Sequence, residues 1–138
     1  MDNPSPRLKK RLTVFEAIYS NLVLGTINEE IQKPNCDKSE WGGFEKRIFK
    51  KYIKKKEQYL SSINELLASD WDVSRLNLSI LAVLLEAFSE YETFKTDPSV
   101  LIHQAILIAR EYGEDEHKLV HAVIDAYLRQ LRGSEVTN

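Results

Sequence analysis

The sequence predicts an all-α fold, a single-domain helical bundle of about six or seven helices, from the spacing of its apolar residues. These residues recur at three- and four-residue steps, which places them on one face of a helix. Turn-forming residues are scarce, with five glycines and four prolines in the chain. The sequence contains no internal repeat. The length of 138 residues is typical of one domain. We expect residues 7–132 to form it, between a disordered lead-in of residues 1–6 and a C-terminal tail of residues 133–138.

Composition and charge exclude several classes of protein. The longest apolar run, residues 76–88, contains Asn77 and Glu86, so it is too short and too polar to span a membrane. Residues 1–11 are polar and basic without an apolar segment after them, which argues against a secretory signal. The single cysteine, Cys36, excludes an internal disulfide and favours a reducing cytoplasm. A net charge of −2 means that any contact with nucleic acid must come from a local basic patch.

The first predicted helix runs from residue 7 to about residue 24, and its beginning is strongly basic. Positive charges at a helix start oppose the macrodipole, so helix stability does not account for them. Either they form a solvated helix end or they contact the phosphates of a nucleic acid. The four cations are Arg7, Lys9, Lys10 and Arg11. The expected core face of this helix comprises Leu8, Leu12, Phe15, Ile18, Tyr19, Leu22 and Val23.

A second long helix is predicted from Phe44, which is expected to face the core, to about Leu67. It follows a loop over residues 26–42, in which Trp41 is expected to close over the core. One face of this helix is strongly basic and is either solvated or attractive to RNA, a choice that the sequence leaves open. The cations of this face are Lys46, Arg47, Lys50, Lys51, Lys54, Lys55 and Lys56.

Capping signals delimit the remaining helices. Asn77 is expected to cap a central, buried helix whose apolar residues extend to Phe88, followed by a connector over residues 89–97. Pro98 suits the first turn of the next helix, and Gly113 suits the position after its end. The apolar face of that helix comprises Val100, Leu101, Ala105, Ile108, Ala109 and Tyr112. The last helix follows with Leu119, Val120, Val123, Ile124, Tyr127, Leu128 and Leu131.

No residues are arranged as in a typical catalytic or metal site. The sequence has no phosphate-binding loop, dinucleotide fingerprint, zinc-protease motif or nucleophile elbow. His117 and His121 lie four residues apart, but a zinc site would need a further ligand nearby. Asp115 and Glu116 beside Lys118 are interpreted as helix-end charge rather than as an acid–base pair. We therefore expect neither an enzyme nor a bound cofactor or metal.

Three stretches resemble motifs of a known family. One is A-I-Y at residues 17–19 behind the basic segment, and another is Trp71 followed by R-L at residues 75–76. The third comprises Pro98, I-H-Q-A at 102–105, A-R at 109–110, Y-G at 112–113, H-K-L-V at 117–120 and V-I-D at 123–125. Together they resemble the NusB family of bacterial transcription antitermination factors. Members of this family are all-α proteins that bind boxA RNA together with ribosomal protein S10.

The resemblance implies an RNA site, a protein-partner face and a cytoplasmic protein that is a monomer or weak homodimer. The S10 face would lie on the central helix, near Asn77 and Glu86. We also expect the cationic beginning of the chain to lie beside the turn and helix start at residues 113–118. By resemblance, the RNA-contacting residues would be Arg7, Lys9, Lys10, Arg11, Tyr19, Asp115, Lys118 and Leu119.

Some positions depart from the family pattern. Leu119 stands where the family usually has a phenylalanine able to stack on a base, and His121 and Ala122 replace an Asn-Gly pair. Stacking contributes about 1–3 kcal/mol per base, so these departures lower the expected RNA affinity. Two alternatives follow. One is a protein-interaction scaffold of the same fold with weak RNA affinity, and the other is a stand-alone relative of the RNA-binding helical domain of rRNA cytosine methyltransferases.

Overall fold

The computed structural model describes residues 6–24, 41–67, 74, 76–112 and 116–136, and these ranges contain five helices and no strand. The helices are α1 (Pro6–Leu24), α2 (Gly43–Leu66), α3 (Leu78–Phe94), α4 (Pro98–Glu111) and α5 (His117–Val136). The all-α prediction is therefore confirmed, although the described ranges hold fewer helices than the six or seven predicted. The predicted helix start at residue 7 and end at residue 24 agree with α1 to within one residue.

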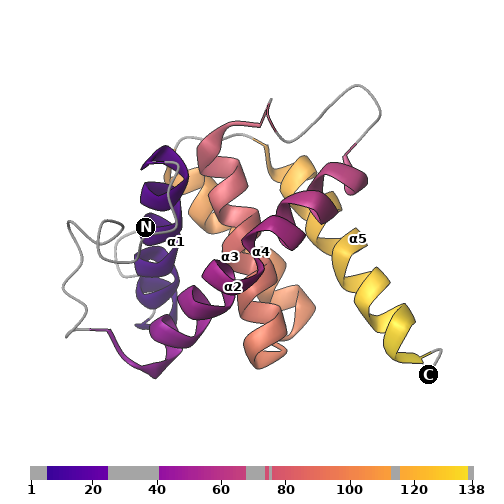
Figure 1. Ribbon diagram of the computed structural model, residues 1–138, viewed down its shortest axis with the longest axis horizontal. Coiled ribbons are helices and arrows are strands. Elements are labelled where there is room, and N and C mark those ends of the chain that lie inside the picture. The colour runs from indigo at the N-terminus through magenta and orange to yellow at the C-terminus, as the bar shows by residue number, and fades with distance from the viewer. Residues whose placement is uncertain (1–5, 25–40, 68–73, 75, 113–115, 137–138) are drawn as a thin grey trace.

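Helix α3 lies at the centre of the bundle, and the other four helices pack around it (Figure 1). Every residue from Ile80 to Tyr91 is buried, so α3 is enclosed on all sides for about three turns. The predicted cap is confirmed, because the side-chain oxygen of Asn77 accepts a hydrogen bond from the Ser79 N–H at 3.1 Å. The central helix therefore positions every other element of the fold.

Helix α3 continues to Phe94, through much of the segment predicted as a connector. Two of the polar residues that suggested a connector, Ser89 and Glu90, are buried with hydrogen-bonding partners. The Ser89 hydroxyl donates to the Leu85 carbonyl at 2.7 Å, and Glu90 binds Arg11 of α1. A buried polar side chain with satisfied hydrogen bonds is compatible with a helix interior. The connector prediction is wrong because these partners cannot be read from the local pattern.

The predicted core face of α1 is confirmed in part, because Leu8, Phe15 and Ile18 are buried. Tyr19 and Val23 are 38% and 56% exposed, whereas the polar side chains of Arg11 and Asn21 are buried. The Tyr52 hydroxyl of α2 donates a hydrogen bond to the amide oxygen of Asn21. Polar groups can occupy the core side of α1 because the neighbouring helices satisfy them. The apolar residues that α1 buries are Leu8, Val14, Phe15, Ala17 and Ile18.

Helix α2 begins with a capping arrangement around Gly42. The carboxylate of Glu45 accepts a hydrogen bond from the Gly42 N–H at 3.2 Å, and Glu45 itself is buried. The preceding Trp41 is 6% exposed and meets the ring of Phe49 edge-on at 5.6 Å between ring centroids. The predicted role of Trp41 as a lid on the core is thus confirmed, and α2 enters the bundle at a defined position.

Helices α4 and α5 form a helical hairpin that packs against α3. The carboxylate of Asp97 accepts from the Ser99 N–H at 2.9 Å, and Pro98 occupies the first turn of α4 as predicted. Two residues of its predicted apolar face, Val100 and Tyr112, are instead 45% and 40% exposed.

Helix α5 reaches Val136, so it extends into the segment predicted as a C-terminal tail. The predicted cap Gly113 and the neighbouring Asp115 lie outside the described residues. Within those residues, no helix combines the length and apolarity that crossing a bilayer requires.

Candidate nucleic-acid interface

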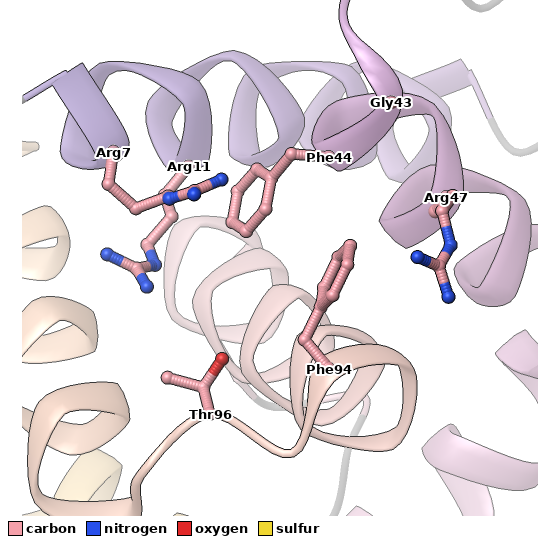
Figure 2. Close-up of a pocket in the computed structure, with 7 residues that line it drawn as sticks. All are labelled: Arg7, Arg11, Gly43, Phe44, Arg47, Phe94 and Thr96. Atoms are coloured by element: carbon pink, nitrogen blue, oxygen red, sulfur yellow. The ribbon is translucent and has the colours of Figure 1, made fainter.

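A cleft of about 430 Å³ opens where the first turns of α1 and α2 meet the end of α3 (Figure 2). Two of these elements are fixed locally: α2 by its cap at Gly42, and α3 by Lys95, which ends the helix with a φ of 54°. The cleft contains three guanidinium groups and two phenylalanine rings. Its lining residues are Arg7, Arg11, Gly43, Phe44, Arg47, Phe94 and Thr96.

Two arginines and two phenylalanines of the cleft form a layered stack. The rings of Phe44 and Phe94 lie 5.2 Å apart at an angle of 18°. The Cζ atom of Arg7 lies 4.2 Å from the centroid of Phe44, and that of Arg47 lies 4.6 Å from the centroid of Phe94. Both distances are typical of cation–π interactions, and these interactions hold the side chains of Arg7 and Arg47 at the mouth of the cleft. Both arginines are exposed, and in the described part of the chain neither forms an ion pair.

Arg11 has a different environment from the other N-terminal cations, because it is only 6% exposed. Its Nε and Nη2 atoms donate to the two carboxylate oxygens of Glu90, both at 2.8 Å. Its Nη1 atom donates to the side-chain oxygen of Gln104 in α4 at 3.0 Å. Arg11 therefore joins α1 to α3 and α4. Three of its N–H groups are used inside the protein, so its role as a phosphate-contacting residue stays a prediction, and its shown role is to hold the helices together.

Glu86 and Glu90 of α3 lie together in the buried cluster around Arg11, and their pKa values are shifted in opposite directions. Burial and the neighbouring charge of Glu90 raise the pKa of Glu86 well above its usual value. Burial alone would also raise the pKa of Glu90, but the hydrogen bonds that it accepts, foremost those from Arg11, lower it. Because Glu86 is 2% exposed, the prediction that it belongs to a protein-partner face is wrong. Its side chain points into the bundle and takes part in packing.

The remaining predicted RNA residues of α1 are distributed over its surface. Lys9 is exposed and Lys10 is half-buried, both within one turn of Arg7. Tyr19 is exposed too, but it lies twelve residues after Arg7, about 18 Å further along α1 at 1.5 Å per residue. The structure therefore separates Tyr19 from the cleft.

The end of α4 packs against the middle of α1. The Tyr112 ring lies 4.6 Å from the Phe15 ring between centroids, and its hydroxyl donates to Glu16 at 3.1 Å. We predicted that the turn after α4 lies beside the cationic beginning of the chain. The described residues bring Tyr112, the residue that caps the end of α4, to Phe15, one helical turn from Arg11 and about 12 Å along α1 from Arg7. Because residues 113–115 are not described, the position of Asp115 stays a prediction.

Lys118 lies on a second groove, of about 540 Å³, between α4 and α5. All three histidines of the chain line this groove, namely His103, His117 and His121. No set of three or more metal-ligating side chains is placed to hold an ion within the described residues. Leu119, the next residue, is half-buried and packs against the core. Lys118 and Leu119 therefore do not share the cleft with Arg7.

Sequence reasoning missed the aromatic part of the cleft. Phe44 was expected in the core, Arg47 on a separate basic face, and Phe94 in a connector. The spacing of Phe44 and Arg47 places them on one side of α2, which was a usable signal. Their meeting with Phe94 depends on how α2 and α3 pack, and no local pattern encodes that contact.

Comparison with known proteins finds similarity over nearly the whole chain. The sequence matches the NusB family over residues 8–129. Proteins named transcription antitermination protein NusB from Neisseria meningitidis serogroup B and Neisseria gonorrhoeae are each 30% identical over 135 residues, which cover 94% of both chains. One solved structure is described as a conserved hypothetical protein from Mycoplasma genitalium with structural homology to NusB proteins. It matches with a TM-score of 0.69 and 25% identity, covering 83% of this chain and 92% of that one.

Removal of the Arg11 guanidinium tests the role of the buried ion pair. We expect Arg11→Met to lower the free energy of unfolding by about 3–5 kcal/mol, because Glu90 would keep a buried charge without its main partner. The matched control is Arg7→Met, an exposed position on the same helix. Urea denaturation measures both variants, and equal stabilities would contradict the assignment of Arg11 to the core.

The raised pKa of Glu86 predicts a pH-dependent contribution to stability. The folded protein keeps the proton of Glu86 at pH values where the unfolded chain, with a pKa of about 4.3, has lost it. This contribution is complete below the unfolded pKa and disappears as the pH rises through the folded pKa. We therefore expect the melting temperature of Glu86→Gln to rise relative to that of the natural protein as the pH increases from acidic to neutral. Parallel curves for the two proteins, measured by circular dichroism with exposed Glu65→Gln as the control, would refute this assignment.

Proposed function

The chain belongs to the NusB family, and on that premise we propose that it is a transcription antitermination factor that binds boxA-like single-stranded RNA together with ribosomal protein S10. The curated relatives named as antitermination proteins align along 94% of their length, which supports a role for the complete domain. Such a factor acts by binding, without catalysis or a cofactor, and works in the cytoplasm where transcription takes place.

The observation that carries the RNA proposal is the layered stack in the cleft between α1, α2 and α3. Arg7 and Arg47 expose their guanidinium groups there. A planar guanidinium group can donate two parallel hydrogen bonds to one phosphate, or it can stack on a base. Phe44 and Phe94 hold those planes in position, so less side-chain freedom is lost on binding. Single-stranded RNA offers both unstacked bases and phosphates, and it is the ligand that best matches this combination.

The proposed RNA surface differs in part from the one implied by the family resemblance. Arg7, Lys9 and Lys10 remain in it, whereas Arg11 supports the cleft from within the protein. Tyr19 and Lys118 are exposed at separate places and would contact other parts of the RNA. Leu119 packs against the core and lacks an aromatic ring, so we assign it a supporting role at most.

The proposed S10 face is the beginning of α3. Asn77 is exposed there as the helix cap, and the adjacent Leu78 is a large apolar residue that is 38% exposed. Exposed apolar side chains next to polar groups are typical of protein interfaces. Glu86 is left out of this face because it is buried.

A protein-interaction scaffold with weak RNA affinity is the second candidate function. The half-buried Leu119 favours it, because the chain lacks a stacking ring at a position where the family usually has one. The two candidate functions differ in how much the cleft contributes to RNA binding, because a pure scaffold would not need the exposed arginines.

A salt titration of RNA binding tests the proposed function. We expect the natural protein to bind a short boxA-like oligoribonucleotide with an affinity that falls as salt increases, because binding releases counterions. The double variant Arg7→Gln/Arg47→Gln should bind more weakly, with a slope of log K against log salt that is less steep by about 0.7 per lost phosphate contact. The control, Arg110→Gln/Arg132→Gln, removes two exposed charges elsewhere. Fluorescence anisotropy measures the binding of all three proteins. If they bind the RNA equally and weakly, the result favours the protein-interaction scaffold.

A capture assay with immobilised S10 tests the protein partner. We expect Leu78→Glu to reduce retention of the protein at an unchanged melting temperature, because the new charge would have to be desolvated in the interface. Val100→Glu is the matched control, since Val100 is similarly exposed but lies on α4. Full retention of Leu78→Glu would exclude this face.

A further inference from the structure

The first half of α2 carries an unusual excess of positive charge for a chain whose net charge is −2. Residues 43–56 contain seven lysines and arginines and one carboxylate, Glu45. That carboxylate is buried and accepts the hydrogen bond of the Gly42 N–H, so it serves as the helix cap and is not available at the surface. The charge of this half of α2 is therefore almost entirely uncompensated on the exposed side.

Three of these cations form a continuous exposed row, which we call the α2 row: Lys46, Lys50 and Lys54. They follow one another at four-residue steps, so adjacent members lie about one helical turn apart and the row is about 12 Å long. In the described part of the chain none of them is paired with a carboxylate. The nearby Lys55, by contrast, binds Glu92 of α3 at 2.9 Å.

The position of the α2 row continues the cleft. Lys50 lies three residues after Arg47, so the two are neighbours on the surface of α2, and the Arg47 guanidinium lies on the Phe94 ring at the mouth of the cleft. From there the row extends along α2 toward the C-terminal end of that helix. Like charges at four-residue steps weaken a helix slightly, so the row does not serve the stability of α2.

We propose that RNA flanking the boxA-like element leaves the cleft along α2, with its phosphates held by Lys46, Lys50 and Lys54. This inference rests on the proposed function and extends its binding surface. The contacts would be independent of the flanking sequence, because ammonium groups on flexible stems read phosphate charge and not base edges. The row would thereby add affinity for long transcripts without changing which element is recognised.

A polyanion fits the α2 row better than a protein surface does. None of the large apolar residues that are strongly exposed in the described chain lies on α2. Protein interfaces usually have an apolar centre and contain few lysines. The row offers charge alone, which is the feature that single-stranded nucleic acid binders use to follow a phosphate backbone.

Anisotropy titrations with two RNAs test this proposal. One RNA is the short boxA-like element, and the other is the same element extended by unstructured nucleotides on both sides. We expect the natural protein to show a steeper salt slope with the extended RNA. The variant Lys50→Gln/Lys54→Gln should lose about 0.7 of slope per removed cation with the extended RNA and bind the short RNA as the natural protein does. Its melting temperature should be unchanged or higher, because a repulsive pair is removed.

The outcomes separate this proposal from the one on which it rests. Arg110→Gln/Arg132→Gln again controls for net charge, and we expect it to retain the full slope with the extended RNA. Identical slopes for the natural protein and Lys50→Gln/Lys54→Gln on the extended RNA would overturn the α2 proposal while leaving the cleft intact. Failure of the natural protein to bind even the short RNA would overturn the proposed function, and the α2 proposal with it. Loss of S10 capture by the lysine variant, with RNA slopes unchanged, would reassign the row to a protein partner.

Discussion

The ion pair between Arg11 and Glu90 is the constraint on which the arrangement of this protein depends. Glu90 lies on the enclosed part of α3, where an isolated carboxylate would be costly, and Arg11 meets both of its oxygens at 2.8 Å. Because Gln104 accepts from the same guanidinium, the pair sets the position of α1 relative to two other helices. A buried pair of this kind contributes little net stability compared with apolar packing, but it specifies one arrangement because a shifted helix would leave charges unpaired.

The same pair determines how the N-terminal cations divide between interior and surface. Arg11 faces α3, and the helical period then places Arg7, one turn earlier, at the edge of the bundle beside Phe44. Thr96 also donates to Glu90 at 2.7 Å, so the back of the cleft is joined directly to the buried cluster. The interior charge is neutralised within the protein, and the guanidinium groups of Arg7 and Arg47 are left to face a ligand.

Local signals predicted the fold well because they act over a few residues. The cap at Asn77 and the proline that opens α4 are set by their immediate neighbours, and the lid formed by Trp41 packs on Phe49, only eight residues further along the chain. The errors concern residues whose environment depends on distant helices. Polar side chains such as Ser89 and Glu90 look like surface residues until their partners are known. The contact of Phe44 with Phe94 joins two residues that are far apart in sequence. The candidate site depends on local signals, which indicated its charge, and on contacts between distant residues, which form its aromatic layers. The sequence therefore indicated the charge but not the layers.

The layered stack has a consequence for the thermodynamics of folding. It connects side chains from the beginnings of α1 and α2 with one from the end of α3, so its geometry exists only when those three helices are assembled. A ligand that recognises the stack binds the native chain and not the unfolded one, and mass action then shifts the equilibrium toward the native state. Ligand occupancy and resistance to denaturation are therefore linked quantities in this protein, and each reports on the other.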